Sequence, residues 1–261
     1  MPAISVITAC KNSADRISGL YESLANQTYS DFEWIVADGA SEDGTDALMQ
    51  GLSRRHSWLR YTSEPDGGIY NAINRAIGRA TGKYYVVAGD DDTFSADALS
   101  RYAELTSAGG ADVVFARVHR GNRVIGGFHP RRAWLGPSRI FASSHSIGTL
   151  IRRALHERFG PYSPRFPLLA DVYFLKTLFL AKTVTFLDAG FIAGTFAEGG
   201  ATTTQQLQLL AENWQIQMLT ERYPSIQTLM FLGKVLVRYE ALSREVRARR
   251  ASPLAPEARK A

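Results

Sequence analysis

The sequence has few of the features that mark secreted, zinc-binding or membrane-spanning proteins. Its single cysteine, Cys10, cannot form an internal disulfide, and no cluster of Cys and His has zinc-ligand spacing. No stretch approaches the roughly 18 consecutive apolar residues that a spanning helix needs. The glycine-rich phosphate motifs G-x-G-x-x-G and G-x-x-x-x-G-K-[ST] are both missing. We therefore expect a reducing, cytoplasmic compartment and no phosphate loop of either type.

The net positive charge of the chain comes from its C-terminal end. Hydrophobic residues make up 45% and charged residues 21% of the 261 residues, so a sizeable core can form. A formal net charge of +5 is typical of proteins that bind nucleic acids. Eight basic and three acidic residues lie beyond position 231, however, so the preceding part of the chain is balanced. We therefore expect no nucleic-acid partner.

Hydrophobic periodicity predicts an α/β fold. Short β-branched or aromatic runs alternate with helical-period segments, the pattern of a parallel sheet covered by helices. We predict strands at 3–9, 32–38, 59–63 and 84–88 and helices at 15–26, 43–53, 68–80 and 96–107. A hairpin over 112–128 precedes an irregular stretch, 129–168, with one helix near 152–158. Further helices are predicted at 169–181, 205–222 and 225–247.

Three consecutive carboxylates, Asp90, Asp91 and Asp92, follow the predicted strand 84–88. Open α/β sheets bind ligands at the carboxyl ends of parallel strands. Three adjacent carboxylates repel one another unless a cation or hydrogen-bond donors neutralise them. This pattern predicts a site for Mg²⁺ or Mn²⁺ bridging to phosphates. The alternative is a solvated acidic turn that caps the next helix.

A second acidic turn, residues 38–45, follows the strand 32–38. Ser41 and Asp43 can cap the next helix, which explains their presence without a ligand. Capping does not explain Asp38, which ends its strand at the same sheet edge as the Asp triplet. We therefore expect Asp38 to accept hydrogen bonds from a base or a ribose.

Taken in order, these motifs resemble those of the family 2 nucleotide-sugar glycosyltransferases. The matching segments are SVIT at 5–8, the turn 38–45, EPDGGIYNA at 64–72, the triplet 90–92, His145 with the IRR of 151–153, Ala170-Asp171 and EGGAT at 198–202. The resemblance covers about residues 3–205. It implies a single Rossmann-like A-type domain with a mostly parallel central sheet, whose donor half spans about 1–95 and acceptor half about 96–205. A C-terminal helical extension, 206–250, and a flexible tail, 251–261, follow.

The resemblance also implies an activity. It implies metal-dependent, inverting transfer of a sugar from a UDP-sugar to a hydroxyl of a glycan or lipid-linked acceptor in surface polysaccharide biosynthesis. Asp171 would be the general base, and His145 would contact the diphosphate, the metal or the acceptor. The donor-contacting residues would be Thr8, Ala9, Asn12, Asp38, Asp66, Tyr70, Asp90 and Asp91. The metal ligands would come from Asp90, Asp91, Asp92 and His145, and a run of three acids admits two registers of a two-carboxylate motif.

Two other interpretations stay open at this point. A sugar-phosphate nucleotidyltransferase also combines an α/β sheet with an Asp-held metal, although the segment 8–12 lacks the glycines that a phosphate loop needs. A non-catalytic nucleotide-sugar-binding scaffold would keep the fold without turnover. Three arginines either pair with phosphates or are solvent-exposed surface residues: Arg75, Arg152 and Arg153.

The C-terminal segment has an apolar stripe with basic residues at its margins. The stripe contains Ile226, Leu229, Met230, Gly233, Leu236, Val237 and Val246. One interpretation is a helix packed on the domain with a solvated basic face. The other is peripheral binding to the inner face of an anionic membrane, where lipid-linked acceptors reside.

Overall fold

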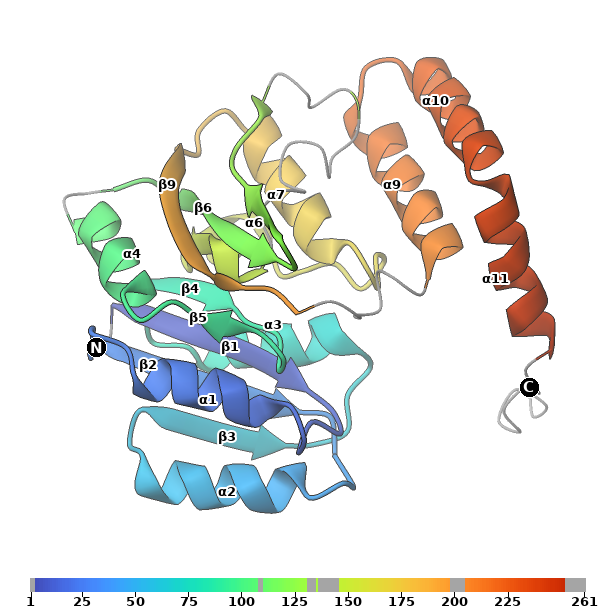
Figure 1. Cartoon of the computed structure of the whole chain (residues 1–261). Helices are drawn as coiled ribbons and strands as arrows, with labels where there is room; N and C mark the ends of the chain where they lie inside the picture. Colours follow the sequence, from blue (N-terminus) through green and yellow to red (C-terminus); the bar gives the residue numbers. More distant parts are fainter. Residues whose placement is uncertain (1–2, 108–109, 131–134, 136–145, 198–204, 252–261) are drawn as a thin grey trace. The chain divides into compact units, whose positions relative to one another are not determined.

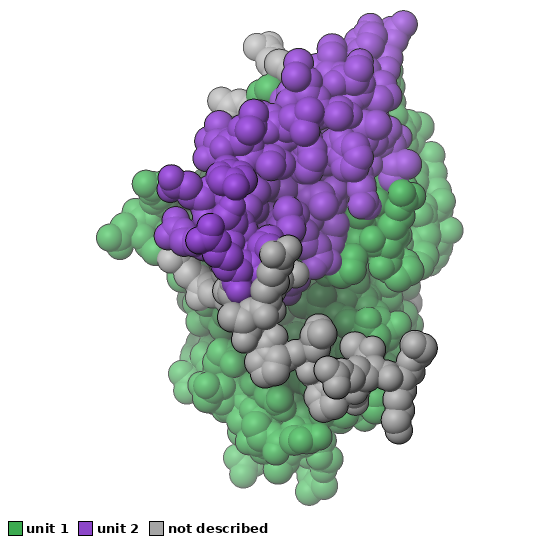
Figure 2. All heavy atoms as spheres, turned by 90° about the vertical axis from the view of Figure 1, so that its right-hand side faces the viewer, with its two compact units in different colours: residues 1–198 green, residues 199–261 purple. Residues whose placement is uncertain are grey.

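The computed structural model describes residues 3–107, 110–130, 135, 146–197 and 205–251 (Figure 1). His145 and the segment 198–202, both singled out in the sequence, lie outside these ranges. The chain divides into two compact units, residues 1–198 and residues 199–261 (Figure 2). The helices within the described ranges are too short or too polar to cross a bilayer.

The first unit is built on a mixed sheet. The described strands are β1 (Ile4–Cys10), β2 (Phe32–Asp38), β3 (Leu59–Ser63), β4 (Tyr84–Val87), β5 (Thr93–Phe94), β6 (Val113–Arg120), β7 (Arg123–Gly126), β8 (Thr149–Arg152) and β9 (Phe186–Thr195). Their order is β3-β2-β1-β4-β8-β6-β9-β5, and β7 pairs with β6 as the predicted hairpin. Strands β1 to β4 are parallel to their neighbours among themselves, whereas β8 is antiparallel to both β4 and β6.

Helices cover both faces of the sheet, which explains why β1 and β2 are apolar almost throughout. On one face Val6 and Trp34 pack with α1 (Ile17–Ala25), α2 (Thr45–Arg55) and α4 (Ala98–Ser107). On the other face lie α3 (Ile69–Arg79), α6 (Leu155–Phe159) and α7 (Ala170–Leu180) (Figure 1). The predicted helices and strands of the first half are therefore present within a few residues.

Strands β5 and β9 and the short β8 were not predicted individually. Gly190 and Gly194 weaken the strand pattern of β9, because glycine is disfavoured in strand interiors. The structure supplies the reason for Gly194: a Cβ at this position would lie 2.0 Å from the Thr93 carbonyl oxygen of β5. The close approach of β5 therefore requires a glycine at position 194, and this glycine also weakens the strand pattern of β9 in the sequence.

The second unit is helical. It contains α9 (Gln206–Thr220), α10 (Pro224–Val237) and α11 (Tyr239–Ala251). The prediction of one helix over 225–247 was wrong, because the helix is interrupted at Arg238. The indole of Trp214 stacks on the Phe231 ring, with 5.2 Å between the ring centroids, and ties α10 to α9.

Candidate active site

The parallel strands bring the predicted donor residues to one edge. The register pairs Cys10 with Asp38 and Asp38 with Ser63, so β1, β2 and β3 end side by side. The Asp triplet follows β4, which pairs with β1 on its other side. Ligands of open α/β sheets bind at such a carboxyl edge.

The Asp38 carboxylate is fully buried and organises the turn that follows it. Its Oδ2 accepts hydrogen bonds from the Ser41 backbone N–H at 2.9 Å and from the Ser63 hydroxyl at 2.6 Å. Its Oδ1 accepts the Ser41 hydroxyl. Burial opposes ionisation, but these hydrogen bonds outweigh it and hold the pKa of Asp38 below its usual value. Ser63 was not singled out in the sequence.

The turn after β1 is bonded to the turn after β2. Asn12 has a positive φ of 52°; its N–H donates to the Ser41 hydroxyl at 2.7 Å, and its Oδ1 accepts the Glu42 N–H at 3.0 Å. The N-cap of α2 is Gly44, not Ser41 or Asp43 as predicted; Asp43 accepts the N–H groups of Ala14 at 3.0 Å and of Thr45 at 3.1 Å. Thr8 is fully buried and its hydroxyl accepts the Trp34 indole N–H, so its side chain belongs to the core. Ala9, beside it, is half-buried.

Asp66 lies against the same pair of turns. Its Oδ1 accepts the Gly68 N–H at 2.9 Å, and its Oδ2 is 2.7 Å from where a Cβ of Gly39 would stand. The Lys11 side chain passes the same point at 3.4 Å. A side chain at position 39 would therefore have to displace the end of the Asp66 side chain.

Asp90 is neutralised by side chains that sequence reasoning did not identify. The Arg16 guanidinium contacts its Oδ2 at 2.8 Å, and the Ser13 hydroxyl donates to the same oxygen. Both residues lie in the turn that joins β1 to α1. The signal that would have found Arg16 is the need for a cation beside three carboxylates, combined with a basic residue at the start of the helix that follows β1.

Asp92 and Asp91 have different surroundings. Asp92 is fully buried, and its carboxylate accepts the backbone N–H groups of Gly89 at 2.8 Å and Ala197 at 3.3 Å. Burial raises the pKa of Asp92 to about 6. Asp91 is half-buried; burial and the neighbouring Asp90 charge raise its pKa above the usual value. Asp92 therefore anchors the loop and Asp90 is ion-paired, so the three carboxylates of the triplet differ in their surroundings.

Asp171 lies in the first turn of α7 and meets Tyr70, which lies in the first turn of α3. The Tyr70 hydroxyl donates to Asp171 Oδ1 at 2.6 Å and lies 3.2 Å from the Leu168 carbonyl oxygen. Because α3 begins at the carboxyl edge of the sheet, this bond brings Asp171 to the same edge. Tyr70 was predicted to contact the donor; the structure places its hydroxyl on the predicted base.

A buried cluster of rings fixes the position of Tyr70. The Tyr162 ring lies 5.5 Å from that of Tyr70, and its hydroxyl is 2.7 Å from that of Tyr85. The Tyr85 hydroxyl also bonds His156 Nε2 at 2.7 Å. The Asn74 side-chain amide of α3 donates to the Tyr162 carbonyl oxygen at 2.8 Å and accepts the Tyr162 backbone N–H at 2.9 Å. The Asp171 partner is therefore positioned by a packed core and not by a loop.

The three arginines considered for phosphate binding have partners within the protein. Arg75 lies 3.4 Å from Glu64, and Arg152 lies 2.7 Å from Asp112. Arg153 donates to the Gly82 carbonyl oxygen. Among the described arginines, Arg16 is the one found on the Asp triplet.

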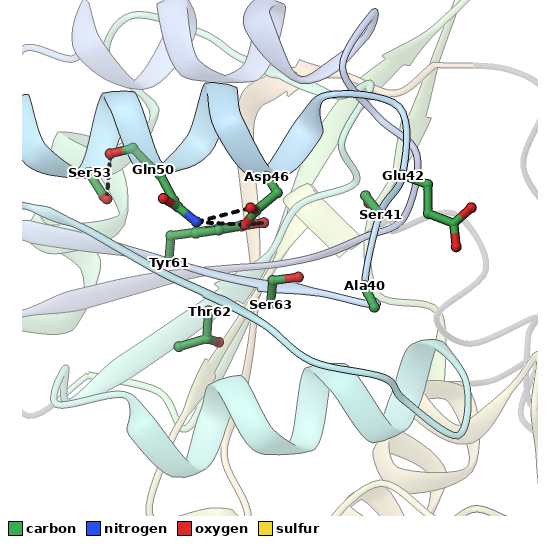
Figure 3. A pocket seen from close by; sticks show the side chains of 9 residues that line it. All are labelled: Ala40, Ser41, Glu42, Asp46, Gln50, Ser53, Tyr61, Thr62 and Ser63. Atoms are coloured by element: carbon green, nitrogen blue, oxygen red, sulfur yellow. Dashed lines mark hydrogen bonds between the residues drawn. The ribbon is translucent and has the colours of Figure 1, made fainter.

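A pocket of about 670 Å³ flanks the Asp38 turn (Figure 3). Its lining consists of Ala40, Ser41, Glu42, Asp46, Gln50, Ser53, Tyr61, Thr62 and Ser63. The Tyr61 hydroxyl and the Gln50 amide both donate to Asp46, each at 3.0 Å (Figure 3). The predicted donor, metal and acceptor residues that the structure describes lie outside this lining.

Comparison with known proteins finds relatives that are named glycosyltransferases. The chain is 31% identical over 184 residues to the Mycobacterium bovis PGL/p-HBAD biosynthesis glycosyltransferase, which covers 65% of this chain and 67% of that protein. It is 31% identical over 104 residues to the putative teichuronic acid biosynthesis glycosyltransferase TuaG of Bacillus subtilis, covering 40% of this chain and 41% of TuaG.

Solved structures share the fold at low sequence identity. S. aureus TarS 1-349 in complex with UDP-GlcNAc has a TM-score of 0.68 and 18% identity, with 94% of this chain and 76% of that chain covered. The mannosyltransferase PcManGT from Pyrobaculum calidifontis, in complex with GDP-Man and Mn²⁺, has a TM-score of 0.66 and 18% identity, with 98% and 77% covered. The predicted A-type transferase fold is thereby confirmed.

The family assignment rests on a direct match. The model of Glycosyl transferase family 2 matches residues 5–169, which include the turn 38–45, the Asp triplet and the start of β8. This match, together with relatives that are named glycosyltransferases, favours the transferase over the nucleotidyltransferase that the sequence left open. The chain belongs to glycosyl transferase family 2 and is a glycosyltransferase.

Proposed function

We propose that this glycosyltransferase moves a sugar, with inversion, from a nucleotide-diphosphate donor of the UDP class to a hydroxyl of a glycan or lipid-linked acceptor. The observation that carries the proposal is the Tyr70–Asp171 hydrogen bond, which brings a carboxylate from α7 to the edge that holds the Asp triplet. TarS bound to UDP-GlcNAc supports the donor class, and relatives named for PGL/p-HBAD and teichuronic acid biosynthesis support a role in surface polysaccharide synthesis.

Asp171 is the proposed general base. Its carboxylate takes the proton of the acceptor hydroxyl as the acceptor oxygen forms its bond to the anomeric carbon. The bond from that carbon to the diphosphate breaks at the same time, and the electron pair leaves with the diphosphate. Tyr70 holds one carboxylate oxygen, which fixes the orientation of the base before the acceptor arrives.

A divalent cation fits the triplet through Asp91. No group of three His, Cys, Asp or Glu side chains in the described ranges could hold a metal ion alone. Mg²⁺ and Mn²⁺ sites, however, commonly use one or two carboxylates and take further oxygens from substrate phosphates. Asp90 is ion-paired and Asp92 is an anchor, so Asp91 is the proposed ligand. A bound cation would neutralise charge on the departing diphosphate. His145 stays a predicted further contact.

The donor nucleoside is proposed to lie over the ends of β1 to β3. Ala9, Asn12, Asp38 and Asp66 surround this edge, and the bonded turns after β1 and β2 give it a fixed shape. Asp90 and its Arg16 partner are proposed to close the site toward the diphosphate. We assign catalysis to residues 1–205 and regard the helices of 206–250 as an extension outside the reaction.

Isothermal titration calorimetry with UDP-GlcNAc and GDP-mannose, with and without Mn²⁺, tests these roles on the full chain. Wild type should bind the UDP-sugar more tightly with Mn²⁺, and Asp91→Asn should lose that increment. Asp97→Asn, which removes an exposed carboxylate paired with Arg101, is the matched control. An unchanged Mn²⁺ increment in Asp91→Asn would contradict the metal assignment, and no binding of either donor by wild type would contradict the proposed function.

The base is tested separately by release of UDP from the bound donor. Asp171→Asn should bind the donor as wild type does and lose turnover. Asp46→Asn is a close control, because Asp46 also lies in the first turn of a helix and accepts a tyrosine hydroxyl. Wild-type turnover in Asp171→Asn would overturn the base assignment while leaving the donor site intact.

A further inference from the structure

Helix α10 exposes a continuous apolar face. Ile226, Leu229, Leu232, Leu236 and Val237 recur at the three- and four-residue spacing of one helix face. Leu229, Leu236 and Val237 are 71%, 74% and 88% exposed. Clustered large apolar side chains at this exposure mark an interaction surface more than a scatter of single exposed residues does.

The opposite face of α10 already holds the helix in its own unit. The Gln217 amide donates to the buried Gln227 at 2.9 Å, and the Trp214 indole donates to the Thr228 hydroxyl at 3.3 Å. Phe231 stacks on Trp214. The apolar face is therefore not needed to fold the helical unit, and its side chains are available to a partner.

The charge and the aromatic residues around this face indicate which partner fits. Residues 222–250 contain seven basic and two acidic side chains. Arg238, Arg244 and Arg247 are exposed, whereas Glu245 accepts the Leu207 N–H at the start of α9. Tyr223 and Tyr239, 57% and 65% exposed, flank the two ends of α10. Tyrosines at the ends of an apolar face are typical of a membrane–water interface.

We propose that α10 lies in the headgroup region of an anionic lipid bilayer, with its apolar face toward the acyl chains and exposed arginines of the helical unit on lipid phosphates. Burial of apolar surface and attraction to anionic lipids add together in such interfacial helices. A nucleic acid would leave the leucines in water. This inference does not depend on the proposed donor, metal or base.

Flotation of the full chain with lipid vesicles tests the proposal. Wild type should float with mixed phosphatidylglycerol and phosphatidylcholine vesicles, less so with phosphatidylcholine alone, and less at high salt. The double variant Leu229→Asp/Leu236→Asp should lower the bound fraction about tenfold or more. Leu180→Asp, at a leucine that is 45% exposed in the first unit, should float as wild type does.

The charge contribution is tested by Arg244→Gln/Arg247→Gln, with Arg54→Gln/Arg55→Gln on exposed α2 positions as the matched control. The first pair should reduce binding to the anionic vesicles and flatten its salt dependence; the control pair should change neither. Circular dichroism confirms that each variant is folded. Failure of wild type to float, or wild-type flotation by Leu229→Asp/Leu236→Asp, overturns the proposal. So does a dimer in light scattering that this variant dissociates, because the face would then join two copies of the chain.

Discussion

Replacing Tyr70 with phenylalanine removes one hydroxyl and leaves the ring that packs on Tyr162. The lost bond is short, 2.6 Å, and its acceptor is the Asp171 carboxylate. A hydrogen bond to a charged group contributes about 1.5–3 kcal/mol. This bond favours the ionised form of the carboxylate, so removing the donor should raise the pKa of Asp171.

The expected result is a change in the pH profile of turnover. A base must be ionised to act, so the acid limb of kcat reports its pKa in the enzyme–substrate complex. Tyr70→Phe should move that limb to higher pH. On the plateau, kcat should fall by about tenfold, because the carboxylate loses a bond that fixes its orientation. The KM for the donor should stay near its wild-type value.

Release of UDP from a UDP-sugar, followed from pH 5 to pH 9, measures both effects. Tyr61→Phe is the matched control, since its hydroxyl also donates to a carboxylate, that of Asp46, at 3.0 Å. This control should keep the wild-type limb. An unshifted limb in Tyr70→Phe would refute the positioning role. A raised donor KM with unchanged kcat would instead return Tyr70 to the donor contact that the sequence predicts.

Three further predictions concern stability. Glu33→Ala leaves the Ser5 hydroxyl and the backbone N–H groups of Thr81 and Gly82 without their buried acceptor. The free energy of unfolding, measured by urea titration, should therefore fall by about 3 kcal/mol. Glu22→Ala, at an exposed position, should leave this free energy nearly unchanged. Gly194→Ala should lower it by about 1–3 kcal/mol, whereas Gly190→Ala on the same strand meets open space; equal effects would contradict the packing argument. Burial lowers the pKa of His156 in the folded protein, so the unfolded state binds more protons below about pH 6.5. The stability of the wild type should therefore fall as the pH falls through that value. In thermal melts, His156→Gln should lose this dependence of stability on pH.

The parallel half of the fold was predictable because each strand and helix carries its own local pattern. Strand β2 contains the apolar run of residues 34–37 and α3 repeats Ala72, Ile73, Ala76 and Ile77 on one face. Strand β9 was not predictable, since Gly190 and Gly194 weaken its strand pattern and Gly194 is explained only by the close approach of β5. The break at Arg238 likewise interrupts a continuous helical pattern. What local pattern cannot show is a requirement imposed by a segment far away in the chain.

In the candidate site, too, the sequence shows what is needed locally but not which distant residues supply it. Composition and position alone indicated that the edge with three adjacent carboxylates requires positive charge or hydrogen-bond donors. The three residues are chemically identical, so their roles differ only through partners distant in sequence: Arg16 for Asp90 and the Ala197 N–H for Asp92. For Asp91, burial and then repulsion from Asp90 disfavour the ionised form. A cation shared with a diphosphate would relieve that repulsion, which makes Asp91, rather than the triplet as a whole, the residue on which metal dependence should turn.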